Sequence, residues 1–163
     1  MRCLACVLVI TGVAGAMAAP HKSPDTFGGY AGLKLRAHPS KTKGFAKAWK
    51  TTDTDNTSIR YAAKKRGAPA FLGVKVDDVV VTVSKHLEFV VGMTLKLSGD
   101  RCAAIEKALG TAWGEAKNVG GMNRQLEWSG TRVGAKMEHQ GTDCLVFVRD
   151  TAWDDVKDEL DKR

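Results

Sequence analysis

The densest alternation of apolar and polar side chains lies in the middle of the chain. Residues 71–76, 79–83 and 87–97 are rich in Val, Phe, Leu and Thr, and short polar breaks at 77–78 and 84–86 separate them. Stretches of this composition favour β-strands, and the breaks suit tight turns. We therefore expect a meander of three antiparallel strands.

The spacing of the apolar residues changes after this meander. Cys102, Ile105 and Leu109 recur at intervals that place them on one face of a helix. Asp100 stands where it can cap the start of that helix, and Gly110 stands where it can end it. This pattern predicts a helix from position 101 to Leu109.

Strand patterns return after the helix. We expect strands over residues 123–128, 131–140 and 143–149, followed by a polar helix over residues 151–162. Together these elements predict an α+β fold. Its antiparallel sheet would have about five to seven strands, packed by one main helix and followed by a polar C-terminal helix.

Two cysteines support this packing. Cys144 shares a face with Val146 on the last expected strand, and Cys102 lies on the apolar face of the expected helix. A Cys102–Cys144 disulfide would hold the helix to the sheet and, in the chain-entropy model, stabilise the fold by roughly 4 kcal/mol. The alternative is a pair of buried free thiols.

The first half of the chain has weaker patterns. Residues 31–37 alternate as a half-buried strand would, and the polar residues 51–58 predict a loop. Between them, Phe45 and Trp49 are four residues apart, so they could share one face of a short helix within residues 42–50.

The N-terminus has the pattern of a secretory signal peptide. Arg2 precedes an apolar run over residues 4–14, and Ala16 and Ala18 supply the small side chains that a cleavage site needs. The apolar run is shorter than the roughly 20 residues of a membrane span. We therefore expect a secreted or periplasmic protein with no stable membrane insertion after cleavage.

This pattern divides the chain into three parts. They are a signal peptide over residues 1–18, a flexible entry segment over residues 19–30, and a single α+β domain over residues 31–163. The mature chain, roughly 145 residues, is long enough to bury a core without several disulfides or a metal. Only two cysteines remain after cleavage, and in an exported protein such a pair most often forms a disulfide.

Positive charge is concentrated in the first half of the mature chain. The formal net charge of +7 falls to +6 when Arg2 leaves with the signal peptide, and the only acids between residues 20 and 76 are Asp25, Asp53 and Asp55. Such asymmetry predicts an anionic partner, and its alternative is a solvated surface that keeps the protein soluble. The candidate anion-binding residues are Lys41, Lys43, Lys47, Lys50, Lys64, Lys65 and Arg66.

Aromatic residues lie among these lysines. Phe45, Trp49 and Tyr61 could stack against an anionic polymer. Alternatively, Phe45 and Trp49 anchor this segment of the chain to the core.

The sequence contains no motif that predicts catalysis or metal binding. Asp53, Asp55 and Thr57 resemble the start of an EF-hand calcium loop, but Ser58 and Lys64 stand where that loop needs a glycine and an acid. A polar turn is the simpler interpretation. The four histidines lack zinc-ligand spacing, so we predict no catalytic residue, no metal site and no cofactor.

These observations favour an exported binding domain over an enzyme. Its partner would be an anionic polymer (an envelope glycan, a lipid head group or extracellular nucleic acid) or a protein. One alternative is a secreted hydrolase whose dispersed site gathers His86 or His139 with acidic side chains. Another is a structural envelope component that pairs through an open sheet edge.

Overall fold

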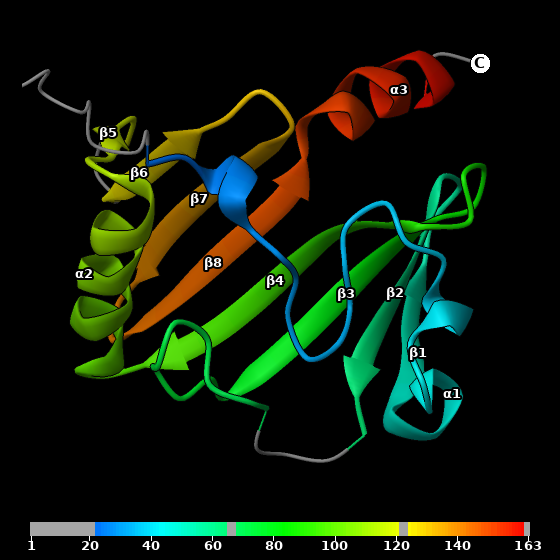
Figure 1. Ribbon diagram of the computed structural model, residues 1–163, viewed down its shortest axis with the longest axis horizontal. Helices are drawn as coiled ribbons and strands as arrows, with labels where there is room; N and C mark the ends of the chain where they lie inside the picture. Colours follow the sequence, from blue (N-terminus) through cyan, green and yellow to red (C-terminus); the bar gives the residue numbers. More distant parts are fainter. Residues whose placement is uncertain (1–21, 65–67, 121–123, 162–163) are drawn as a thin grey trace, which may run out of the picture.

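The computed structural model describes residues 22–64, 68–120 and 124–161, whose strands form one antiparallel sheet of eight (Figure 1). In chain order they are β1 (Trp49–Thr54), β2 (Ser58–Ala63), β3 (Asp78–Ser84), β4 (Val90–Ser98), β5 (Lys117–Asn118), β6 (Gln125–Ser129), β7 (Val133–Gln140) and β8 (Asp143–Asp150). Across the sheet the order is β1-β2-β3-β4-β8-β7-β6-β5. Two meanders of four strands therefore meet where β4 pairs with β8.

Helical elements connect and cover these strands. They are the 3₁₀ turns η1 (Pro24–Thr26) and η2 (Pro39–Lys41) and the α-helices α1 (Phe45–Ala48), α2 (Arg101–Trp113) and α3 (Thr151–Asp161). In Figure 1, α2 lies at one end of the sheet and α1 at the other, and the N-terminal segment crosses the face between them.

The α+β class and the antiparallel sheet are confirmed, whereas the strand number in the described residues is eight rather than five to seven. Both edge strands lack an apolar pattern. β1 occupies much of the polar stretch 51–58 that was expected to be a loop, and Trp49 is its one buried residue. β5 has only two residues, both exposed. Strands at an edge can be polar on both faces because little packs against them.

Two stretches expected as strands, 31–37 and 71–76, are turns. Isolated bridges close them, one between Tyr30 and Leu33 and the other between Phe71 and Val74. All but Val74 of these four residues are buried, so their apolar character reflects side chains that enter the core from turns.

α2 is longer than the spacing predicted. Gly110 lies inside the helix, which ends before Gly114, where φ is +91°. Asp100 is the N-cap residue, as expected, but its side chain makes no capping hydrogen bond. The predicted apolar face is present and gains one residue: the buried residues of α2 are Cys102, Ile105, Leu109 and Trp113.

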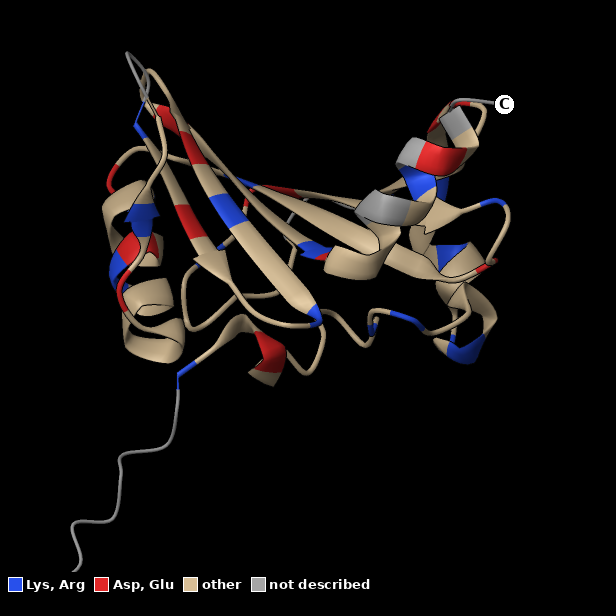
Figure 2. Cartoon of the chain, turned by 90° about the horizontal axis from the view of Figure 1, so that it is seen from above, with Lys and Arg blue, Asp and Glu red and all other residues tan. Residues whose placement is uncertain are grey.

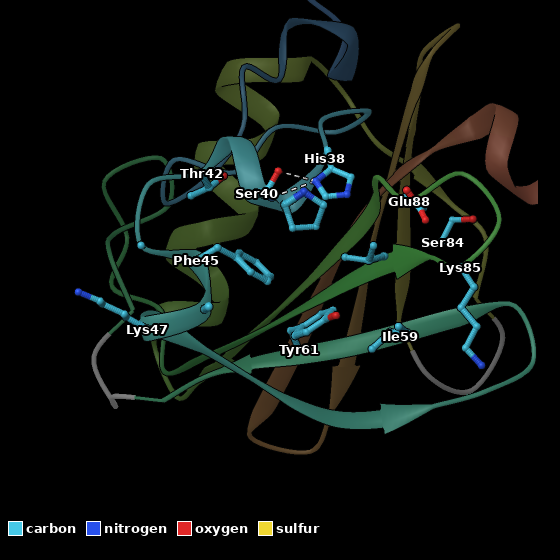
Figure 3. A pocket seen from close by; sticks show the side chains of 14 residues that line it. His38, Ser40, Thr42, Phe45, Lys47, Ile59, Tyr61, Ser84, Lys85 and Glu88 are labelled. Atoms are coloured by element: carbon cyan, nitrogen blue, oxygen red, sulfur yellow. Dashed lines mark hydrogen bonds between the residues drawn. The ribbon is translucent and has the colours of Figure 1, made fainter.

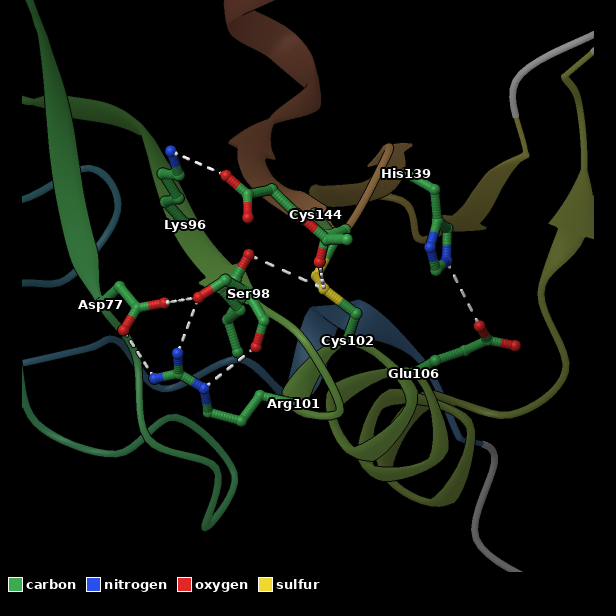
Figure 4. Close-up of a disulfide and its surroundings, with 11 residues drawn as sticks. Asp77, Lys96, Ser98, Arg101, Cys102, Glu106, His139 and Cys144 are labelled. Atoms are coloured by element: carbon green, nitrogen blue, oxygen red, sulfur yellow. Dashed lines mark hydrogen bonds and ion pairs between the residues drawn. A yellow bond between two sulfur atoms is a disulfide. The ribbon is translucent and has the colours of Figure 1, made fainter.

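The predicted pairing of Cys102 with Cys144 agrees with the structure (Figure 4). The two form a disulfide with a Cα–Cα distance of 5.8 Å, which joins α2 to the start of β8. Beside it, the Arg101 guanidinium donates to Asp77 (2.6 Å) and to the Ser98 hydroxyl (2.7 Å). The start of α2 is therefore fixed both covalently and by charge-assisted hydrogen bonds.

The N-terminal segment is attached to the meander of β5 to β8. We expected residues 19–30 to be a flexible entry segment, and the described part of it carries η1. The Asp25 carboxylate accepts hydrogen bonds from the backbone amides of Thr131, Arg132 and Val133, each 2.8 Å long. A Cβ at Gly130 would lie 2.6 Å from an Asp25 oxygen, so this approach requires glycine.

The two faces of the sheet differ. On the inner face, Val81, Leu95 and Val146 belong to a core cluster that α2 and the N-terminal segment help to cover. The outer face carries partly or fully exposed residues such as Thr94 and Lys96.

The expected signal peptide lies outside the described residues and stays a prediction. In the part of the chain that the structure describes, none of the helices combines the length and apolar content needed to cross a membrane.

Candidate functional site

A cavity of about 640 Å³ lies on the inner face, between α1 and strands β2 and β3 (Figure 3). We call it the first cavity. Ile59, Tyr61 and Val83 form its floor, and Phe45 and Pro39 contribute apolar walls. Under α2 the same face of the sheet is covered by a thirteen-residue helix with four buried residues. At the first cavity it is covered by the single turn of α1.

α1 is held above this floor by one aromatic ring and by Lys64, whose ammonium donates to the Ala46 carbonyl and whose backbone amide donates to the Ala48 carbonyl, each at 2.8 Å. The chain enters α1 through Gly44, which has a φ of +76°. Phe45 then stacks on Trp49 with ring centres 5.9 Å apart, and its edge meets Tyr61 at 5.1 Å. Trp49 is 7% exposed and belongs to the core cluster. The anchoring interpretation therefore agrees with both residues: Trp49 belongs to the core, and Phe45 packs against it while also lining the cavity.

Polar side chains border the first cavity. His38 caps η2: its Nδ1 atom accepts a hydrogen bond from the backbone amide of Ser40 at 3.2 Å and lies 2.7 Å from the Ser40 hydroxyl. At the far end the Lys85 ammonium donates to the Asp55 carbonyl. Figure 3 shows Lys47 and Lys85 at opposite ends of the cavity.

A second cavity, of about 700 Å³, adjoins the first on the other side of α1. Lys47 lines both cavities. The rest of its lining is mainly aliphatic and includes Ala48, Ala63 and Pro69.

A third cavity, of about 870 Å³, opens on the outer face. It shares Ala63 and Lys64 with the second cavity and is also lined by Lys50 and Lys75. The three cavities therefore follow one another around the end of β1 and β2. We call the second and third cavities, with Lys64, Lys50, Lys75 and, at the border with the first cavity, Lys47, the basic track.

Several carboxylates near the basic track are engaged locally. In the third cavity, Asp143 pairs with Lys96 (2.9 Å) and Asp77 pairs with Arg101 (2.6 Å). Across the β1–β2 strand pair, Arg60 pairs with Asp53 at 2.7 Å. These pairs offset negative charges that would otherwise oppose an anion.

Asp55 organises the β1–β2 turn. Its carboxylate accepts hydrogen bonds from the Ser58 hydroxyl (2.8 Å) and the Thr57 amide (2.9 Å). Burial by itself would raise the pKa of Asp55, but hydrogen bonds from Ser58 and Thr57 outweigh that effect and lower it to about 2. The carboxylate is thus satisfied by its own turn, in agreement with the polar turn expected there.

The predicted anion-binding residues are divided by the structure. Lys47, Lys50 and Lys64 line the basic track. Lys41 ends η2 and Lys43 lies in the turn before α1, and both are exposed. Figure 2 shows Lys and Arg on α1 and its adjoining loops, at the end of the sheet opposite α2. Lys65 and Arg66 lie outside the described residues.

Two lysines of the site were not among the candidates. Lys75 precedes β3 and Lys85 follows it, and each lines a cavity. Their positive charge was visible in the sequence, but only the pairing of β2 with β3 brings them beside Lys64 and Asp55.

The histidines have other surroundings. His86 is exposed in the β3–β4 turn. The Nε2 atom of His139 lies 3.5 Å from a Glu106 oxygen, and Arg124 donates to the other Glu106 oxygen at 2.5 Å. This pair bridges β7 and α2 beside the disulfide (Figure 4). Within residues 22–64, 68–120 and 124–161, no three His, Cys, Asp or Glu side chains gather as metal ligands would.

Comparison with known proteins adds no relative: no protein-family model, no curated protein and no solved structure matches the chain.

Proposed function

We propose that this protein is an exported, non-enzymatic binding protein whose basic track holds an anionic polysaccharide. The observation that carries this proposal is the sharing of lysines between cavities: Lys47 lines the first and second, and Lys64 lines the second and third. An extended ligand could therefore meet a cation at each passage from one cavity to the next.

The lysines suit a polymer rather than a single small anion. Lys47, Lys50, Lys64 and Lys75 are exposed and lie on different elements around the end of the sheet. Exposed ammonium groups keep their hydration and release counterions when they contact a polyanion. Affinity then comes from several weak contacts along the track.

The lining of the track favours a sugar polymer over a nucleic acid. Single-stranded nucleic acids bind best to exposed aromatic platforms. Here Trp49 is 7% exposed, and the partly buried rings of Phe45 and Tyr61 meet edge to face rather than forming a flat platform. Beside its lysines, the second cavity is lined mainly by aliphatic residues such as Ala68 and Pro69. Aliphatic surface suits the C–H faces of sugar rings between their charged groups.

The test is binding to heparin, a sulfated polysaccharide, with single-stranded DNA of equal charge as the comparison. We expect affinity for heparin to fall roughly 50-fold between 50 and 200 mM salt if four lysines each neutralise one charge. The Lys47→Gln/Lys64→Gln variant should bind heparin more weakly and lose part of the salt dependence. Lys107→Gln/Lys117→Gln, which removes the same charge from exposed residues on α2 and β5, is the matched control.

Three results would contradict the proposal. They are no binding to heparin at low salt, an equal loss of affinity in the two double variants, and tighter binding to DNA than to heparin. Export is tested separately by N-terminal sequencing of the protein from its native source. Ala19 is the expected first residue, and an intact residue 1–18 segment would contradict export.

A further inference from the structure

We propose that the first cavity binds the apolar chain of a single-chain anionic amphiphile, with the anionic head group beside Lys47. This goes beyond the proposed function, because a polysaccharide needs the lysines of the track and not an apolar groove beside them.

The floor of the first cavity is suited to an apolar chain. Ile59 and Tyr61 are only partly buried, although they lie on the same face of the sheet as the core. Val83 continues this surface on β3, and Phe45 and Pro39 flank it. An alkyl chain laid here would remove apolar surface from water on several sides.

The two ends of the cavity differ in charge. At one end the Lys85 ammonium donates to the Asp55 carbonyl, and Glu88 contributes a carboxylate to the same lining. At the other end Lys47 is exposed and continues into the second cavity, which Lys64 also lines. The Lys47 end is therefore the one that complements an anionic head group.

The length of the floor suits one extended chain. It runs along β2 from Tyr61 to the level of Thr57, whose carbonyl accepts the Lys85 amide at 2.9 Å. Four residue intervals in a strand span about 13 Å. The chain would lie along this strand, with its far end near Lys85 and its head group at the start of the basic track.

Dodecyl phosphate is the probe that tests this proposal. Calorimetry is carried out below its micelle concentration, with inorganic phosphate and the neutral dodecyl maltoside as the two comparisons. We expect one dodecyl phosphate per protein, and at least tenfold weaker binding of either comparison. Equal binding of dodecyl maltoside would show that charge plays no part, and equal binding of phosphate would show that the apolar floor plays none. Either result overturns the proposal.

Variants locate the site. Ile59→Asn, in the floor, should weaken dodecyl phosphate binding at least tenfold. Phe45→Ala, in the apolar wall, is the second variant should the first fail to fold. Lys47→Gln should weaken dodecyl phosphate binding about fivefold. Val119→Asn changes an apolar residue on a distant loop that is 41% exposed, so it should leave binding unchanged. Unaltered binding in folded Ile59→Asn or Phe45→Ala protein would contradict the assignment.

Heparin binding separates this inference from the proposed function. Folded Ile59→Asn protein should keep its affinity for heparin while losing dodecyl phosphate. If wild-type protein binds heparin and not dodecyl phosphate, the amphiphile site is wrong and the polysaccharide track stands. If it binds dodecyl phosphate and not heparin, the polysaccharide track is wrong and the amphiphile site stands.

Discussion

The two ends of the sheet are covered in different ways. Over β6–β8, the thirteen-residue helix α2 buries four residues and is joined to β8 by a disulfide. Over β1–β3, the four-residue helix α1 has no fully buried residue and stands beside open cavities. One end therefore resembles a sealed core, and the other leaves apolar and basic surface accessible.

We expect this difference to separate stability from the proposed binding. A rigid scaffold that presents a more open surface is a common arrangement in binding proteins. Here the core extends under the whole inner face, but the helix packed firmly onto it is α2, whereas the residues of the basic track gather around α1. Substitutions at the two ends should consequently have different effects, and the following predictions test that division in order of expected size.

Removal of the disulfide should have the largest effect. The Cys102→Ser/Cys144→Ser variant should lose about 4 kcal/mol of unfolding free energy, because the link closes a long loop. Urea denaturation of the oxidised wild type and the variant measures this loss. A loss below about 1 kcal/mol would mean that packing alone holds α2 to the sheet.

A smaller contrast is expected between two apolar truncations. Ile105 in α2 is 0% exposed, so Ile105→Ala should cost about 3 kcal/mol through the cavity it leaves. Phe45→Ala should cost about 1.5 kcal/mol, because its ring is only partly buried. Urea denaturation of both variants tests the order, and an equal or larger cost for Phe45→Ala would contradict a loosely covered β1–β3 end.

Acid should weaken a turn at each end of the molecule. Burial by itself would raise the pKa of Asp25, but hydrogen bonds from Thr131, Arg132 and Val133 lower it well below its ordinary value. Burial would likewise raise the pKa of Asp55, but its hydrogen bonds from Ser58 and Thr57 outweigh that effect and lower the pKa to about 2. The stability added by each carboxylate is therefore complete above its ordinary pKa of 3.8 and is lost as pH falls through its folded value.

The measurement is the melting temperature between pH 5 and pH 2. Wild type should melt higher than Asp55→Asn at pH 5, and the difference should shrink toward pH 2. Asp25→Asn should show the same trend with its loss at lower pH. A gap that stays constant with pH would show that the charge of these carboxylates is not what stabilises the turns.

The smallest effect on stability is expected in the basic track. Lys47→Gln replaces an exposed side chain, so the free energy of unfolding should change by less than about 0.5 kcal/mol. Heparin affinity should nevertheless fall. Denaturation and heparin binding on one preparation test both statements, and a large loss of stability would place Lys47 in the scaffold.

The elements whose buried residues are regularly spaced could be predicted from the sequence. The apolar face of α2, the strands β7 and β8, and the Cys102–Cys144 pairing all follow from periodic patterns. Elements with irregular or edge environments were missed. β1 looked like a loop because its exposed residues are polar, and Leu33 and Phe71 looked like strand residues although they enter the core from turns.

The basic track could be predicted only in part. The excess of lysine in the first half was evident, but the sequence did not indicate which lysines share a cavity. That depends on β1 pairing with β2, which places Lys50 beside Ala62 on the outer face, while Lys47 stays on α1. Charge counts identify a region, whereas strand register decides which side chains meet.

The hydrogen bonds of Asp25 also have a consequence for the order in which the molecule assembles. Its partners lie more than one hundred positions later in the chain, at Thr131 to Val133. These hydrogen bonds therefore cannot form until most of the polypeptide has been synthesised. Contacts between such distant parts of a chain slow folding, so closure of the N-terminal segment belongs among the last steps.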